Sequence, residues 1–249
     1  MPTLILTPRF TADAQILWRT AGRIGWEVQR LSSWRVPEAM RSIPNPVLYV
    51  EALFGPTLAE QFGLRLLEPA IDWLPRLPEA FRKRWIYLTT LGQARQRLEP
   101  AFVKPANDKS FPAGIYTGAK LPVEYDDAAP VLVAEIVTWE KEFRCFVLDR
   151  CPRTLSLYLR HGQLQREYDF TASDAEQAEA EAFVRAILTD LSIDLPTATV
   201  LDVGVIVGRG WAVVEQNAAW GAGIYGCDPE QALAVIRCAT VPLMVVNQD

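Results

Sequence analysis

The sequence predicts an α/β protein in which a small N-terminal α/β part precedes a larger part made of α+β lobes. Three observations carry this expectation. Over the first 76 residues, short apolar runs alternate with segments of helical pattern, which is typical of a mostly parallel sheet. From about residue 101 onward, apolar strands follow one another in pairs. Half of the 249 residues are hydrophobic and 22% are charged, as in ordinary globular proteins.

The N-terminal elements are bounded by clear start and stop signals. The expected helix over 11–22 begins at a threonine and ends at a glycine, which are common helix termini. Strands are expected over 3–7, 26–31 and 46–52, with a second short helix over 57–63. Pro69, Pro75 and Pro78 then follow within ten residues. We take this proline-rich patch as the boundary between a domain of residues 1–76 and a domain of residues 77–249.

The second domain begins with a helical pattern over 78–98 that the residues YLTT interrupt. Ser173 and Glu176 form a capping box at the start of a helix over 173–191. Asp228 and Pro229 open a last helix as an N-cap and a first-turn proline. Strands are expected over 101–104, 130–137, 142–149, 154–160, 163–169, 198–207 and 210–217.

Composition excludes several classes of function. The net charge of −5 gives the chain no electrostatic footprint for nucleic acid. The longest early apolar run is too short for a signal peptide or a membrane span. Four cysteines without a CxxC pair and a single histidine, His161, argue against a zinc site. A reduced, cytoplasmic protein is therefore expected.

An acidic face is expected on the strand pair 198–207 and 210–217. Glu215 and Asn217 are two residues apart and point to the same side of their strand. If the hairpin turns at Gly208–Arg209, Asp202 lies directly opposite Glu215. Opposed carboxylates repel each other, and three oxygen donors suit Mg²⁺ or Mn²⁺. The alternative is a solvated sheet face on which the charges are splayed apart.

Basic and acidic residues upstream indicate a nucleotide. Lys104 ends a strand and Lys109 follows in a polar loop, where ammonium groups suit phosphate oxygens; the alternative is that both are simply solvated. A loop over 138–141 would place Glu135 opposite Arg144 as an ion pair, with Glu142 on the same face as Arg144. A strand end can bind adenine, a carboxylate can bind ribose hydroxyls and an arginine can bind phosphate.

The order of these motifs resembles the ATP-grasp superfamily. FVKP precedes a loop with a second lysine, AEIV ends a strand, a glutamate follows Glu135 by seven residues, and an aspartate precedes Glu-x-Asn by thirteen. The resemblance covers roughly residues 78–240. It is closest to small bacterial and phage ATP-grasp proteins and to translation-factor assembly proteins of the cell-division-cycle type. It implies an ATP-grasp fold that binds Mg-ATP between two lobes, preceded by a small α/β pre-grasp domain.

The resemblance also implies a role for each position in the nucleotide site. Lys104 contacts the α- and β-phosphates, and Lys109 contacts the β- and γ-phosphates from a closing loop. Arg144 lies near the γ-phosphate or an acyl phosphate, so Arg144 and Lys109 are the catalytic candidates. The remaining roles are an adenine hinge of Glu135, Ile136 and Val137, a ribose contact by Glu142, and a Mg²⁺ (or Mn²⁺) site of Asp202, Glu215 and Asn217.

The activity implied by the resemblance is that of a ligase. It joins a carboxylate to an amine through an acyl phosphate and releases ADP. Its substrates are small molecules or peptides, neither nucleic acid nor a membrane is a partner, and the sequence leaves the oligomeric state open. Two alternatives stay open as well: an ATP-binding assembly protein without ligase activity, and phosphotransfer to a hydroxyl group.

Overall fold

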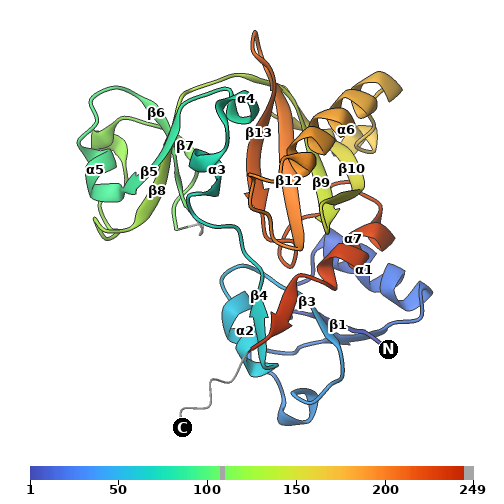
Figure 1. The fold of residues 1–249 in the computed structure, drawn as a ribbon. Coiled ribbons are helices and arrows are strands. Elements are labelled where there is room, and N and C mark those ends of the chain that lie inside the picture. Colours follow the sequence, from blue (N-terminus) through green and yellow to red (C-terminus); the bar gives the residue numbers. More distant parts are fainter. Residues whose placement is uncertain (107–109, 244–249) are drawn as a thin grey trace.

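The computed structural model describes residues 1–106 and 110–243, and its elements gather in three groups (Figure 1). The N-terminal group lies at the bottom of Figure 1, and the other two groups stand above it to the left and right. Among the described residues, no helix combines the length and the apolar character that crossing a membrane requires.

The N-terminal group is built on a parallel sheet with the strand order β2-β1-β3. The side chain of Thr11 caps the first helix by accepting a hydrogen bond from the N–H of Ala14 at 3.1 Å, as its position in the sequence predicts. The elements are β1 (Thr3–Leu6), α1 (Ala12–Arg23), β2 (Glu27–Arg30), a 3₁₀ turn (Glu38–Met40), β3 (Pro46–Tyr49), α2 (Gly55–Gln61) and β4 (Leu64–Leu66).

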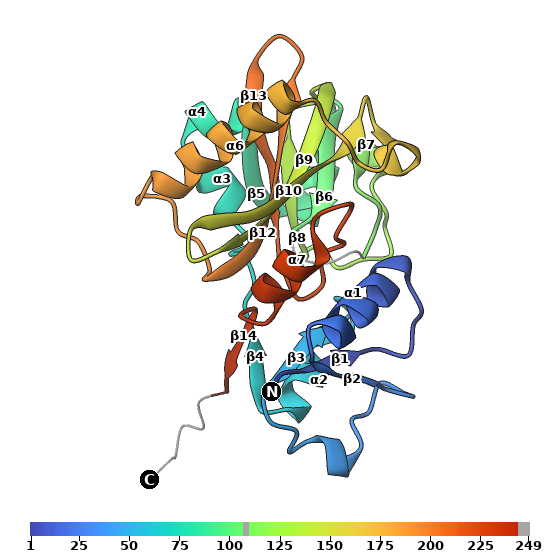
Figure 2. The same cartoon turned by 90° about the vertical axis from the view of Figure 1, so that its right-hand side faces the viewer.

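The C-terminal segment returns to this N-terminal group. Helix α7 (Pro229–Ile236) contributes buried residues to the same hydrophobic core as β1 and β3. Strand β14 (Thr240–Pro242) pairs antiparallel with β4. Figure 2 shows α7 lying between α1 and the sheet above it. The boundary between residues 76 and 77 stays a prediction, and the core of the first group draws on both sides of it.

The second group is a four-stranded antiparallel sheet with the order β5-β8-β6-β7. The expected long helix over 78–98 is wrong, because its β-branched interior forms a strand between two short helices. That stretch contains α4 (Glu79–Arg82), β5 (Ile86–Thr90) and α5 (Leu91–Arg95). The other elements are α3 (Trp73–Arg76), β6 (Ala101–Pro105), β7 (Gly114–Tyr116), a 3₁₀ turn (Gly118–Lys120) and β8 (Pro130–Ala134).

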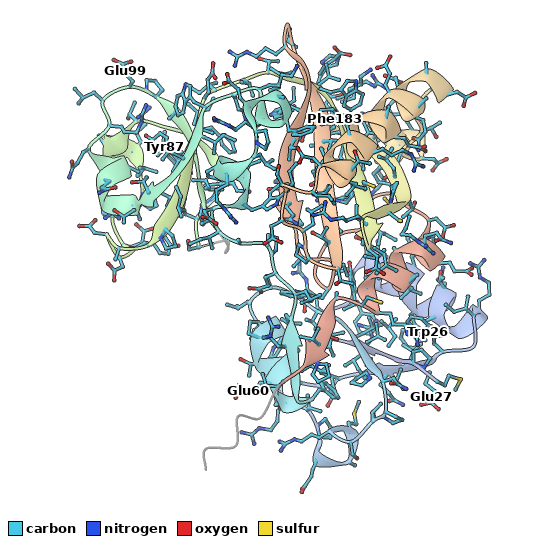
Figure 3. The ribbon with its side chains drawn as sticks, in the orientation of Figure 1. Trp26, Glu27, Glu60, Tyr87, Glu99 and Phe183 are labelled. Carbon is cyan, nitrogen blue, oxygen red and sulfur yellow. The ribbon has the colours of Figure 1, made fainter. Side chains whose placement is uncertain are left out.

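The third group is a five-stranded antiparallel sheet with the order β11-β10-β9-β12-β13. Helix α6 (Asp174–Thr189) covers one face of it, and the predicted capping box of Ser173 and Glu176 is confirmed. Phe183 of α6, labelled in Figure 3, stacks on Trp211 with ring centroids 6.0 Å apart. The strands are β9 (Trp139–Leu148), β10 (Cys151–Arg160), β11 (Gln163–Leu164), β12 (Ala198–Ile206) and β13 (Gly210–Asn217), and a 3₁₀ turn (Gln165–Tyr168) replaces most of the strand expected over 163–169.

The expected hairpin between residues 130–137 and 142–149 is wrong. Strand β8 belongs to the four-stranded sheet and β9 to the five-stranded sheet. Both edges of β8 are already paired, with β5 and with β6, so no edge is free for β9. Residues 135–138 therefore connect the two sheets, and Glu135 does not face Arg144.

Candidate active site

A cavity of about 590 Å³ is lined by residues from all three groups. The end of β6, the end of β13 and the loop over 218–225 form most of its walls. Its charged, amide and aromatic side chains are Glu68, Lys104, Phe111, Arg144, Glu215, Gln216, Asn217, Trp220 and Tyr225. This set includes four residues that the sequence predicts for the nucleotide site.

The loop over 218–225 is held in place by the N-terminal group. The carbonyl oxygen of Trp220 accepts a hydrogen bond from the N–H of Val50 at 3.0 Å. Asp13, in the first turn of α1, accepts a hydrogen bond from the N–H of Ile224 at 3.1 Å. The N-terminal group therefore supplies both lining residues and support to the cavity.

A β-bulge turns the end of β13 toward the cavity. Near the hairpin turn, Val203 pairs with Val213, but the next pair is Asp202 with Glu215, so Val214 is an extra residue. Such a residue shifts the alternation of side chains along its strand. The predicted pairing of Asp202 with Glu215 is confirmed, although the bulge rather than the expected turn produces it.

Glu215 forms the centre of a small charged network. Its Oε2 lies 2.6 Å from the Nζ of Lys104 on β6, and its Oε1 accepts a hydrogen bond from the Asn217 amide at 3.1 Å. Burial alone would raise the pKa of Glu215, but the charge and hydrogen bond of Lys104 outweigh burial and lower it to about 2. Glu215 is therefore ionised at neutral pH.

Asp202 forms a buried ion pair with Arg144. Its Oδ1 accepts from Nε of Arg144 at 2.9 Å, and its Oδ2 accepts from Nη2 at 2.6 Å. Asp202 is 0% exposed, and the Asn217 amide also donates to its Oδ2 at 3.1 Å. The guanidinium of Arg144 lies 5.3 Å and 4.7 Å from the ring centroids of Tyr158 and Tyr225. Arg144 lines the cavity, whereas Asp202 does not.

Glu142 is buried on the same strand, two residues before Arg144. The hydroxyl of Tyr158 donates a hydrogen bond to its Oε2 at 2.8 Å. Burial raises the pKa of Glu142 to about 7, although the Tyr158 hydrogen bond acts in the opposite direction. A buried carboxyl group that changes charge near neutral pH makes the stability of the protein sensitive to pH.

We expect the free energy of unfolding to contain a contribution from Glu142 that is lost as pH rises. The folded-state pKa of about 7 exceeds the ordinary value of 4.5, so the folded state binds more protons between these values. Its contribution is complete below about pH 4.5 and lost by about pH 7. Urea unfolding at pH 5 and pH 7.5 should show a smaller difference for Glu142→Gln than for the wild type. An equal difference in both proteins contradicts this assignment.

The expected adenine hinge lies in the connection between the two sheets. The N–H of Glu135 donates to the carbonyl oxygen of Trp85 at 3.0 Å. The Glu135 carboxylate accepts two hydrogen bonds from Arg209, at 2.9 and 2.5 Å, and these lower its pKa. Ile136 is exposed and Val137 is half-buried. The hinge role of this segment stays a prediction.

The structure brings six of the predicted residues into one connected region. Lys104, Glu215, Asn217, Asp202 and Arg144 are joined by consecutive hydrogen bonds. Glu142 adjoins Arg144 through Tyr158. Lys109 lies outside the described residues. Sequence reasoning missed Tyr158, Tyr225 and Arg84, whose partners come from distant parts of the chain.

Glu215 and Asn217 fit a bound Mg²⁺ ion. Both line the cavity and carry oxygen atoms, the ligand type that Mg²⁺ prefers. Both oxygens of Asp202 are engaged by Arg144 and Asn217, and Asp202 as a third ligand stays a prediction. Within residues 1–106 and 110–243, no group of three or more His, Cys, Asp or Glu side chains is arranged to hold a metal ion.

Comparison with known proteins shows what the chain is similar to. Solved structures that resemble it include a RimK-domain ATP-grasp protein from Sphaerobacter thermophilus (16% identity, 95% of this chain and 99% of that chain, TM-score 0.56). D-alanine–D-alanine ligase from Bacillus anthracis complexed with ATP is similar too (13% identity, 95% and 96%, TM-score 0.57). A third is a RiPP-associated ATP-grasp ligase from Chryseobacterium gregarium in complex with ADP and a leader and core peptide (12% identity, 95% and 96%, TM-score 0.50).

At these identities the solved structures establish the fold. A sequence search among curated proteins finds no match. The sequence of residues 81–235 matches a protein family described as an ATP-grasp domain, the second family of its clade. Because this match spans more than half of the 249 residues, the chain belongs to that ATP-grasp family.

Proposed function

We propose that the protein is an ATP-dependent ligase that joins a carboxylate to an amine through an acyl phosphate. One observation carries the proposal. In a single cavity, Lys104 lies beside Glu215 and Asn217, with the guanidinium of Arg144 on the same wall. Cations that can bind phosphate next to oxygen ligands that can hold Mg²⁺ are what phosphoryl transfer from ATP requires.

The chain's own residues would bind and orient ATP. Lys104 would contact the α- and β-phosphates, Glu142 the ribose, and residues 135–137 the adenine. Glu215 and Asn217 would hold Mg²⁺, which supplies charge neutralisation of the phosphates when bound. Lys109 as a second phosphate contact and Asp202 as a further metal ligand are part of the same proposal.

The reaction proceeds in two steps. A carboxylate oxygen of the acid substrate attacks the γ-phosphorus of ATP, and ADP leaves with the electrons of the broken bond. The amine then attacks the acyl carbon, phosphate leaves, and the nitrogen loses a proton. None of the described residues that line the cavity is a Ser, Cys or His. The attacking oxygen therefore comes from the substrate rather than from an enzyme nucleophile of those types.

We infer that small-molecule or peptide carboxylates and amines are the substrates. The cavity of about 590 Å³ lies within the usual size range of small-molecule sites. The ATP-grasp ligase from Chryseobacterium gregarium was solved with a leader and core peptide, which is a reason to include peptides among the candidates. The aromatic wall of Phe111, Trp220 and Tyr225 suits an apolar portion of such a substrate.

The test is a screen of amino acids and short peptides for ADP release and for the mass of a new amide. We expect ADP only when an acid and an amine are both present, and hydroxylamine should trap the acyl phosphate as a hydroxamate. Lys104→Ala should weaken Mg-ATP binding roughly 10- to 100-fold, the usual range for one hydrogen bond to a charged group. Lys120→Ala, an exposed lysine of the same group, is the control and should behave as the wild type.

Three outcomes would contradict ligation. ADP release at the same rate without an acceptor indicates simple hydrolysis. A phosphorylated alcohol indicates transfer to a hydroxyl group. ATP binding that raises the melting temperature without turnover on any acceptor favours an ATP-binding assembly protein instead.

A further inference from the structure

Arg84 is a buried arginine that connects the two upper groups. It lies two residues before β5 and is 8% exposed. Its Nη1 donates to the carbonyl oxygen of Val213 at 2.7 Å, and its Nη2 donates to that of Val214 at 3.0 Å. Its guanidinium carbon lies 4.9 Å from the ring centroid of Trp139. Burial lowers the pKa of Arg84 to about 10, so the side chain remains charged at neutral pH.

Both carbonyl groups belong to the β-bulge of β13. Val214 is the extra residue between the pairs Val203–Val213 and Asp202–Glu215. A bulge disrupts the hydrogen-bonded ladder locally, and a buried carbonyl group without a donor costs free energy. The two N–H groups of Arg84 supply donors at this point of the strand.

The bulge decides which way the following residues face. Val213 faces the core under α6, together with Val203 and Leu201. Without the extra residue, alternation would place Glu215 on that same apolar face and Val214 on the face of Asp202. With it, Glu215 and Asn217 line the cavity. The orientation of both proposed metal ligands therefore depends on the bulge.

We propose that Arg84 is a positioning residue for the magnesium site, because it holds the bulge that directs Glu215 and Asn217 into the cavity. The inference rests on the proposed function, in which these two residues bind Mg²⁺. Arg84 acts through the backbone of Val213 and Val214. Its fork matches two carbonyl groups at once, which a lysine ammonium does not reproduce with the same geometry.

The competing explanation is that Arg84 only fastens the two groups together. A matched control exists in Arg150, whose Nη1 donates to the carbonyl oxygens of Leu188 and Asp190 at 3.1 and 3.2 Å. Arg150 does not line the cavity. Arg84→Met and Arg150→Met both remove an arginine that binds backbone carbonyl groups, but only the first one touches the bulge.

The experiment measures ATP affinity by calorimetry with and without excess Mg²⁺, together with urea unfolding. In Arg84→Met, the gain in ATP affinity that Mg²⁺ provides should fall roughly 10- to 100-fold, as for other groups that orient metal ligands, while ATP without Mg²⁺ binds as in the wild type. Arg84→Lys should keep part of the gain. Arg150→Met should lose stability and keep the whole gain.

A second route keeps the test decisive if Arg84→Met does not fold. Arg84→Lys and a chain that lacks Val214 should each lose Mg²⁺-linked affinity. A full Mg²⁺-linked gain in either variant would overturn the inference, as would equal weakening of ATP binding with and without Mg²⁺. If the wild type gains no affinity from Mg²⁺, the proposed function itself fails and the inference fails with it.

Discussion

Glu215→Gln should lower ATP turnover at least about 100-fold, in the range found for losing one preorganised electrostatic group in an active site. Glu215 carries the ionised carboxylate nearest to Lys104, at 2.6 Å, and its pKa of about 2 keeps it charged. Glutamine keeps the shape but removes the charge that would hold Mg²⁺. The rate of ADP release, measured at saturating ATP and Mg²⁺, checks this.

The stability of the Glu215→Gln protein should change by less than about 1 kcal/mol. The Glu215 side chain is 30% exposed and that of Lys104 is 22% exposed, and ion pairs of this kind contribute little. The loss of Lys104 as a partner is also offset by relief of repulsion with Asp202, directly opposite on β12. Urea unfolding of the protein without nucleotide gives this value.

Glu176→Gln is the matched control. Glu176 also has a pKa lowered to about 2, through a hydrogen bond with Arg160, and it lies 3.2 Å from Lys141. It belongs to α6, outside the cavity. We expect this variant to lose some stability and to keep wild-type turnover. Wild-type turnover in Glu215→Gln, or a stability loss of several kcal/mol, would instead mark Glu215 as a structural residue.

Local patterns in the sequence predicted much of the fold. The caps at Thr11, Ser173 and Asp228 are present, because a cap depends only on residues within one turn. The pairing of Asp202 with Glu215 is also local, since both lie on one hairpin. The ordered set of motifs identified the ATP-grasp family, to which the chain belongs. The closer resemblance to phage and assembly proteins stays a prediction.

Contacts between distant segments were not predictable in the same way. The apolar strands 130–134 and 139–148 are adjacent in the sequence and suggest a hairpin, but they belong to different sheets. Strand alternation reports which residues are buried and not which neighbour covers them. Arg144 consequently pairs with Asp202 and Glu135 with Arg209, and neither partner is signalled by spacing.

Arg84 shows the same limit most clearly. Its two acceptors are backbone carbonyl groups about 130 positions later in the chain, and a carbonyl group leaves no residue-type signal. The bulge at Val214 is equally silent, because Val213 and Val214 are both ordinary strand residues. A single sequence could therefore place Glu215 on the correct face only through the assumed turn.

Asp202→Ala should lower the free energy of unfolding by about 3–5 kcal/mol, the cost of leaving one buried charge without its partner. Asp202 is fully buried, and Arg144 is 6% exposed with two hydrogen bonds to it, at 2.9 and 2.6 Å. Glu135→Ala is the control, since it breaks a two-bond pair with Arg209 that is partly exposed. That variant should lose less than about 1 kcal/mol.

A double variant separates the cost of the lost partner from a need for Asp202 itself. Replacing the pair by Asp202→Leu and Arg144→Met removes both charges, and buried pairs replaced in this way often regain stability. We expect the double variant to recover most of the loss in urea unfolding, whereas ATP turnover stays absent because Arg144 lines the cavity. If Asp202→Ala costs no more than Glu135→Ala, the buried pair contributes little to folding. Asp202 would then be free to bind Mg²⁺ directly, because its release from Arg144 would cost little.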